Sequence, residues 1–222
     1  VRLMAKDVEV MVRQTLAESL RKAVRLPHDV ALKLAQDVES VAFPVLENST
    51  VLTDDDLTAI IQSGAVGKQE AIASRAVVSE KISEALITTG GETAVAKLMG
   101  NVGAKIAETS LTKAVDRFAA SDMVKEKMVK RPTLPAAVTE RLVTMVSENL
   151  KDYLVQHHEM SPTVAANLVL QSRERTVIGI SGKSTEQELE KMVTQMHLNK
   201  RLTPSIVLRA LCMGDVPFFE TA

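Results

Sequence analysis

Residues 41–86 read VAFPVLEN (41–48), LTDDDLTAII (52–61), QEAIASR (69–75) and VSEKISEAL (78–86), and this stretch decides the fold. In the last of the four segments, Val78, Ile82 and Leu86 follow one another at four-residue spacing. Such positions form a single stripe along a helix of 3.6 residues per turn. The stretch therefore predicts a succession of short amphipathic helices, each with one buried face.

The same spacing recurs along the whole chain. Each copy begins with an apolar anchor: Leu26, Leu52, Val78, Ile106, Leu134 and Met160, which are 26, 26, 28, 28 and 26 residues apart. A nearly constant step of this size fits a pair of short helices that stacks on the next pair. We therefore predict an all-α fold, with a HEAT-like α-solenoid of stacked helical hairpins over residues 1–158. Residues 159–222 are expected to form a smaller C-terminal helical unit packed on the last repeat.

Two arginines recur at equivalent points of this repeat. Arg75 and Arg131 each precede an anchor and are 56 residues apart. Arginines repeated once per unit often donate hydrogen bonds to carbonyl groups of the preceding turn or to a carboxylate, and so join neighbouring units. The alternative is a ladder of arginines along a partner-binding groove. The pattern favours the structural role and keeps both residues as candidates for partner binding.

Composition limits the class of protein. Of 222 residues, 45% are apolar and 25% are charged, as in soluble globular domains. Lys and Arg number 27 against 28 Asp and Glu, so a net charge of −1 gives no general attraction to nucleic acid or anionic membranes. No apolar run approaches the roughly 20 residues that cross a bilayer. The single cysteine leaves no internal disulfide, so we expect a cytoplasmic protein with no membrane association.

Nucleic-acid binding is the runner-up function. The basic run that favours it consists of Lys113, Arg117, Lys125, Lys127, Lys130 and Arg131. Acidic residues interrupt this run, so a solvated helical face is the better interpretation. The chain also has only four Phe, one Tyr and no Trp, whereas single-strand platforms and most sugar sites need aromatic rings on which to stack.

Three short motifs resemble chemical sites without meeting their requirements. GISGKS (179–184) lacks the first glycine and the preceding strand of a phosphate-binding loop, so it predicts a helix end with a capped restart at Ser184. Asp54–Asp56 follow Thr53 as the first turn of a capped helix, and His157–Glu159 lack the spacing of zinc ligands. We therefore predict no catalytic residue, metal or cofactor. An enzyme of unrecognised type stays open, because catalytic groups distant in sequence leave no motif.

Several blocks resemble a known family. They are LAQDVESVAFPVLENSTVLTDDDLTAII (34–61), QEAIASR, VSEKISEALI (78–87), LMGNVGAKI (98–106) and LTPSIVLRALCMGDVPFFE (202–220). They are similar to an uncharacterised alphaproteobacterial family of HEAT-like helical proteins, domain of unknown function 2336, over roughly residues 34–219. AIASR (71–75) and RALCMGDVPFF (209–219) are the more specific blocks. The resemblance implies a HEAT-like fold and a bacterial cytoplasmic setting, and it supplies no substrate, catalytic residue or partner.

The C-terminal aromatic pair is the second candidate partner site. Members of the resembled family continue beyond PFFE (217–220), which implies a longer protein or a short member. Phe218 and Phe219 would then lack a covering helix and form a patch that can dock elsewhere. We expect a non-catalytic scaffold that binds another protein through the curved inner face or this C-terminal end. Association of like chains through the C-terminal end is left open.

Overall fold

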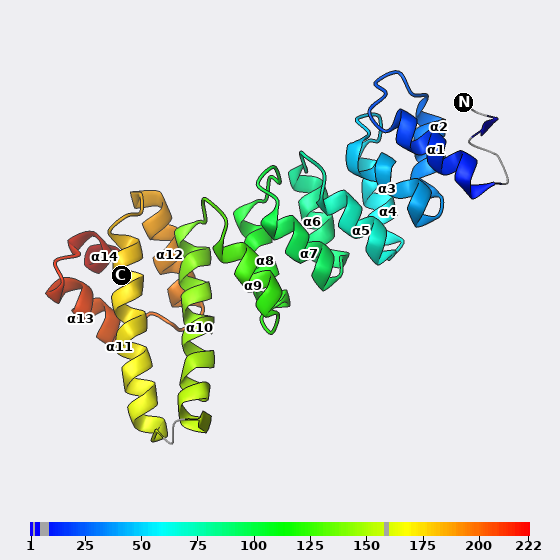
Figure 1. Ribbon diagram of the computed structural model, residues 1–222. Coiled ribbons are helices and arrows are strands. Elements are labelled where there is room, and N and C mark those ends of the chain that lie inside the picture. The colour runs from blue at the N-terminus through cyan, green and yellow to red at the C-terminus, as the bar shows by residue number, and fades with distance from the viewer. Residues whose placement is uncertain (2, 5–8, 158–159) are drawn as a thin grey trace. The chain divides into compact units, whose positions relative to one another are not determined.

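Helices are the regular elements of this chain. The computed structural model describes residues 1, 3–4, 9–157 and 160–222, and within them it has fourteen helices and no strand (Figure 1). The first nine are α1 (Val10–Leu20), α2 (His28–Gln36), α3 (Glu39–Asn48), α4 (Asp54–Gln62), α5 (Val66–Ala73), α6 (Glu80–Thr89), α7 (Glu92–Gly100), α8 (Glu108–Arg117) and α9 (Asp122–Val129). The others are α10 (Ala136–His157), α11 (Pro162–Ser181), α12 (Glu186–Leu198), α13 (Pro204–Cys212) and α14 (Val216–Thr221). The predicted all-α class is confirmed.

Side-chain caps set several helix starts. Thr53 and Asp56 form a reciprocal capping box at the start of α4, as the sequence predicted, and Ser79 caps α6. The predicted cap of α12 was wrong by one residue. Thr185 caps that helix, whereas the hydroxyl of Ser184 donates back to the carbonyl oxygen of Ile180 at 2.9 Å. The β-branched run TVIGI, residues 176–180, is helical and belongs to α11.

The chain divides into two compact units, Val1–Pro132 and Thr133–Ala222. The predicted boundary at residues 158 and 159 lies outside the described residues. The observed division comes earlier because α10 packs on α11 and α12 and so belongs with the helices that follow it. Among the described helices, none combines the length and the apolarity needed to cross a membrane.

In the first unit, helices alternate between two rows. One row has α3 against α5, α5 against α7 and α7 against α9, and the other has α4 against α6 and α6 against α8. At the N-terminal end, α1 and α2 both pack on α3. From α3 to α9, each helix thus contacts the one two places further along the chain, which brings residues about one sequence repeat apart into contact.

The predicted helix stripes are buried in this unit. Ile82 and Leu86 of α6 are 1% and 0% exposed, and Leu111 and Val115 of α8 are 4% and 2% exposed. Three anchors are also buried: Leu26, Leu52 and Val78, at 6%, 6% and 1% exposure. The other three anchors, Ile106, Leu134 and Met160, are half-buried. The helical period was therefore interpreted correctly over this region.

The second unit has a different plan. The long helices α10 and α11 form a hairpin, α12 packs on α10, α13 packs on α11, and α14 contacts both α12 and α13. One hydrophobic cluster, which includes Val177, Met192 and Phe218, fills the space between these helices. The last predicted stripe was wrong, because Val164 and Leu168 of α11 are 55% and 53% exposed.

Candidate functional site

Arg75 joins two successive pairs of helices. Its guanidinium donates from Nη2 to the carbonyl oxygen of Ser49 at 2.6 Å and from Nη1 to that of Leu46. These carbonyl groups belong to the last turn of α3 and to its C-cap residue, where the helix itself supplies no donor. Burial lowers the pKa of Arg75, and the charge of Asp54 opposes that shift.

Arg131 makes the equivalent contact further along the chain. Its Nη1 donates to the carbonyl oxygens of Met99 and Asn101, both at 3.1 Å, and its Nη2 donates to that of Ala104 at 3.1 Å. Burial lowers the pKa of Arg131 as well. Both arginines therefore cap the C-terminal end of an earlier helix, α3 or α7. These bonds support the structural interpretation, and partner binding by either arginine stays a prediction.

Asn101 caps the C-terminal end of α5, the helix that packs between α3 and α7. Its Nδ2 donates to the carbonyl oxygens of Ala73 and Arg75 at 2.8 and 2.7 Å, and its Oδ1 accepts from the backbone of Gly103 at 2.9 Å. The ends of α3, α5 and α7 are thus each capped by a side chain from roughly one repeat later. Asn48, at the end of α3, instead donates to the carbonyl oxygen of Pro44 within its own helix, at 3.0 Å.

The backbone also contributes to the contact between successive repeats, which we call a joint. An isolated parallel bridge links Val78 to Ala104, with Val78 N donating to Gly103 O at 3.3 Å and Lys105 N donating to Val78 O at 2.9 Å. The two backbone segments approach so closely that a Cβ on Gly103 would lie 1.9 Å from the carbonyl oxygen of Ala76. Only glycine fits at this position of the joint.

Gln69 is a joint residue that the sequence analysis missed. It is 2% exposed, its Nε2 donates to the carbonyl oxygen of Ile61 at 2.9 Å, and its Oε1 accepts from the backbone of Gly91 at 3.0 Å. It therefore links three helices, α4, α5 and the start of α7. The block QEAIASR contained it, but a glutamine near a helix start usually faces solvent, so its type gave no signal of burial.

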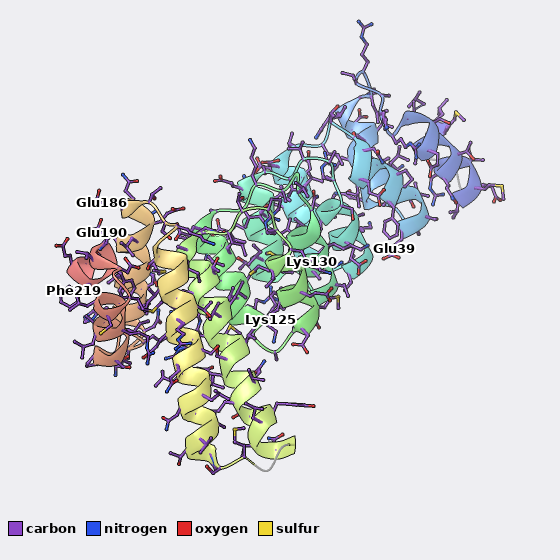
Figure 2. All side chains as sticks on the ribbon, turned by 60° about the vertical axis from the view of Figure 1, so that its left-hand side comes forward. Glu39, Lys125, Lys130, Glu186, Glu190 and Phe219 are labelled. Carbon is purple, nitrogen blue, oxygen red and sulfur yellow. The ribbon has the colours of Figure 1, made fainter. Side chains whose placement is uncertain are left out.

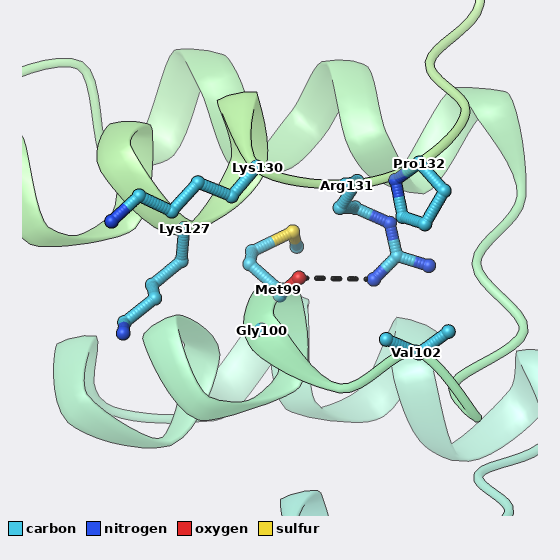
Figure 3. A pocket seen from close by; sticks show the side chains of 7 residues that line it. All are labelled: Met99, Gly100, Val102, Lys127, Lys130, Arg131 and Pro132. Atoms are coloured by element: carbon cyan, nitrogen blue, oxygen red, sulfur yellow. Dashed lines mark hydrogen bonds between the residues drawn. The ribbon is translucent and has the colours of Figure 1, made fainter.

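A small opening lies beside Arg131, where α7 meets α9 (Figure 3). Its volume is about 160 Å³. Val102 on its rim is 77% exposed, and Figure 3 shows two lysine side chains on one side of Met99 and the guanidinium on the other. The residues that line it are Met99, Gly100, Val102, Lys127, Lys130, Arg131 and Pro132. The opening thus combines apolar walls with cationic groups.

Most members of the basic run have partners inside the first unit. The partners are Glu84 for Lys113, the Ile87 carbonyl for Arg117, Asp122 for Lys125, Glu126 for Lys130 and the α7 carbonyls for Arg131. Lys127 forms no ion pair with any residue that the structure describes. Five of the six basic residues therefore already contact protein groups, and Lys127 is the member most available to a ligand.

The acidic triplet Asp54–Asp56 serves the helix start. Burial alone would raise the pKa of Asp56, but hydrogen bonds from Thr53 and His28 outweigh it and hold that pKa below its usual value. The three carboxylates accept, in order, from Ser79 Oγ at 2.6 Å, Lys81 Nζ at 2.5 Å, and Thr53 N at 2.8 Å. Within the described ranges, no three His, Cys, Asp or Glu side chains come together as a metal site.

The other two motifs also lie at helix ends. GISGKS spans the end of α11 and the turn before Thr185, and Gly182 is the C-cap of α11. His157 is the last residue of α10, while residues 158 and 159 lie outside the described residues, so the histidine pair is not placed.

The structure corrects the expected C-terminal patch. Phe218 is 0% exposed and belongs to the core cluster of the second unit, because α12 and α13 both pack against α14. It cannot contact a partner without leaving that core. Phe219, which lies on α14 near the surface in Figure 2, is only half-buried, and its role in partner binding stays a prediction.

Two buried carboxylates in the second unit escaped the sequence analysis. Glu140 and Glu174 are each 1% exposed; Glu140 pairs with Arg201 at 2.5 Å and Glu174 with Arg209 at 2.7 Å. Ser205 also donates to Glu174 at 3.1 Å. These pairs tie α10 and α11 to the segments around α13. A glutamate within an amphipathic helix ordinarily faces solvent, so the sequence gave no sign of them.

Comparisons with known proteins identify the family. No curated protein and no solved structure matches the chain. The model of one family, described as "uncharacterised protein conserved in bacteria (DUF2336)", matches residues 41–222. This match includes the arginine joints, the opening beside Arg131 and the whole second unit. The chain therefore belongs to the bacterial family DUF2336.

Proposed function

We propose that this protein is a non-catalytic interaction scaffold of the bacterial cytoplasm, built as a HEAT-like solenoid of stacked helical hairpins. Support comes from the order of contacts in the first unit, where from α3 to α9 each helix packs on the one two places further on. Polar contacts between these helices also follow the repeat: Arg75 and Ser49 are 26 residues apart, and Lys113 and Glu84 are 29 apart. Stacks of this kind offer extended surfaces to other proteins.

The opening between α7 and α9 is the observation that carries the proposal. Small-molecule sites usually have volumes of about 300–1,000 Å³, so about 160 Å³ is too small for one. A cavity of about 150 Å³ can hold a benzene molecule, which is the size of one apolar side chain. Side chains that fill well-packed pockets contribute much of the binding energy of a protein interface. We propose that an apolar side chain of a partner enters there.

The charge beside the opening specifies the partner further. Lys127 is exposed and has no ion pair with a described residue, and the pair of Lys130 with Glu126 is exposed on both sides, at 65% and 61%. Exposed pairs contribute little and exchange easily. The partner segment is therefore proposed to carry a carboxylate next to its apolar anchor.

Nucleic-acid binding is the second candidate, since Lys127, Lys130 and Arg131 line one opening. A binder of this class neutralises several phosphates along a strand. Five of the six basic residues in this run already contact protein groups, which favours the peptide over the nucleic acid.

A quantitative pull-down tests these two candidates. The full chain is immobilised and exposed to lysate of the bacterium that encodes it, in parallel with Lys127→Ala/Lys130→Ala. The control is Lys81→Ala/Lys113→Ala, which removes two exposed lysines from α6 and α8. The expected result is a captured protein that Lys127→Ala/Lys130→Ala no longer binds and Lys81→Ala/Lys113→Ala still binds.

Two results would count against the proposal. Equal capture by both variants would exclude the opening as the binding site. Salt-sensitive binding of single- or double-stranded oligonucleotides by the purified chain, lost in Lys127→Ala/Lys130→Ala, would favour the nucleic-acid candidate.

A further inference from the structure

One apolar stripe of α10 is covered along only half of its length. Val138, Leu142, Val146, Leu150 and Tyr153 follow one another at spacings of four, four, four and three residues, which keeps them on one side of the helix. The first two are 1% and 4% exposed, whereas the last three are 55%, 48% and 53% exposed. The cover therefore ends about halfway along α10.

The partner helix α11 also has exposed apolar residues in this region. Ala165 and Val169 are 0% and 8% exposed, so they mark the side of α11 that faces α10. Val164 and Leu168 each precede one of them by a single position and are 55% and 53% exposed. They lie beside the contact line between the two helices.

The exposed residues of both helices share one face of the hairpin. On α10, Leu150 and Tyr153 likewise precede the half-buried Lys151 and Leu154 by one position. The two helices are antiparallel (Figure 1). In an antiparallel pair, positions that precede the contact residues in both helices point to the same side. Together the exposed residues form what we call the hairpin patch: Val146, Leu150, Tyr153, Val164 and Leu168.

The hairpin patch carries no charge, and among the residues that the structure describes its nearest exposed neighbours are also uncharged: Asn149, Gln156, Asn167 and Gln171. The exposed Arg175 lies further along the same face of α11, seven residues after Leu168. The acidic residues of this part of α10, Glu148 and Asp152, lie roughly 150° around the helix from the patch, at 100° per residue. Two copies of the patch can therefore meet without like charges inside the apolar contact itself.

We propose that the hairpin patch binds the same patch on a second copy of this chain, so that two hairpins pair as a four-helix arrangement around a two-fold axis. Five half-exposed side chains of this size leave about 450 Å² of apolar surface accessible. A standard interface buries about 800 Å² on each partner, of which about 57% is apolar. The patch thus supplies about the apolar area that one side of a stable dimer needs. The apolar stripe of α10 would then be covered over its whole length.

Sedimentation equilibrium of the full chain tests this pairing at about 1–100 µM, the range in which such an interface associates. The expected result is a dimer. Leu150→Glu/Leu168→Glu should raise the dimer dissociation constant at least about 100-fold, because it places four carboxylates in one apolar interface. Both positions are half-exposed in the single chain, so its helical circular dichroism should stay unchanged.

Leu208→Glu is the matched control. Leu208 lies on α13 of the same unit and is 61% exposed, so this variant should remain a dimer. A chain that stays monomeric at about 100 µM would overturn the proposal. So would a dimer that Leu150→Glu/Leu168→Glu leaves intact, since the two copies would then meet elsewhere, for example at the C-terminal end.

Discussion

Replacing Arg131 by Met should loosen the joint between α7 and α9 by about 3 kcal/mol. The guanidinium donates three hydrogen bonds of 3.1 Å to carbonyl groups of the preceding repeat. Bonds from a charged donor contribute about 1.5–3 kcal/mol each. Water can partly replace them, and three bonds from one group are not additive, so the net loss is smaller than their sum. Methionine keeps the length of the apolar stem, so the change isolates the polar contacts.

Hydrogen exchange followed by mass spectrometry is the suitable assay, because the two units need not unfold together. A loss of about 3 kcal/mol should speed exchange in α7 and α9 by roughly 100-fold, at about 1.4 kcal/mol for each factor of ten. Exchange in α10–α14 should not change. Arg131→Lys should give an exchange rate between those of the unchanged chain and Arg131→Met, because an ammonium cannot reach all three carbonyl groups.

Lys130→Met is the control, since this neighbouring lysine is 65% exposed and makes only an ion pair with Glu126 four residues earlier. Its effect should stay below about 0.5 kcal/mol. If Arg131→Met changes exchange no more than Lys130→Met does, the arginine does not hold the repeats together and the reasoning fails.

Three further changes test the packing. The Arg13 guanidinium, 2.5 and 2.9 Å from the Asp37 carboxylate, holds the pKa of Asp37 below its usual value of 3.8. The stability that this ion pair adds is therefore complete above pH 3.8 and is lost as the pH falls through the lower pKa of the folded state. In urea titrations, Asp37→Asn should therefore cost about 1–2 kcal/mol near neutral pH and almost nothing at a pH below the folded pKa; an equal cost at both would contradict the ion pair. Gly103→Ala should destabilise the first unit by at least about 2 kcal/mol, because its Cβ would lie 1.9 Å from the Ala76 carbonyl oxygen. Gly179→Ala should stabilise α11 by about 0.5–1 kcal/mol, since nothing lies within 4 Å of the added methyl group, and a loss of stability there would contradict the packing.

Local periodicity predicted the first unit well. Ile82 and Leu86 are buried as their spacing required, and the cap at Thr53 is present. The predicted step of 26–28 residues also returns in the joints, where Arg75 and Asn101 each reach helix ends 26–29 residues away. Burial of a stripe, a helix cap and a contact with the adjacent repeat each depend on one helix and its immediate neighbour. The sequence of one or two repeats therefore suffices to predict them.

The second unit was harder to predict because its burial depends on which helix covers which. Val164 and Leu168 have the spacing of a buried stripe, yet no described helix covers them. An apolar stripe has the same sequence pattern whether another helix covers it or not. Phe218 was expected at the surface, whereas contacts from the two preceding helices, α12 and α13, bury it. Glu140 is buried only because Arg201, 61 residues later, pairs with it.

Cysteine cross-linking tests the repeat register most directly. Nζ of Lys81 lies 2.5 Å from Asp55, and Nζ of Lys113 lies 2.8 Å from Glu84. With Cys212 replaced by serine, a short bifunctional reagent should join cysteines at 55 and 81, and at 84 and 113, within one chain. It should fail to join 55 to 113, because those positions are two helix spacings apart, about 20 Å. Efficient coupling of 55 to 113, or none in the two adjacent pairs, would contradict the stacked-hairpin account.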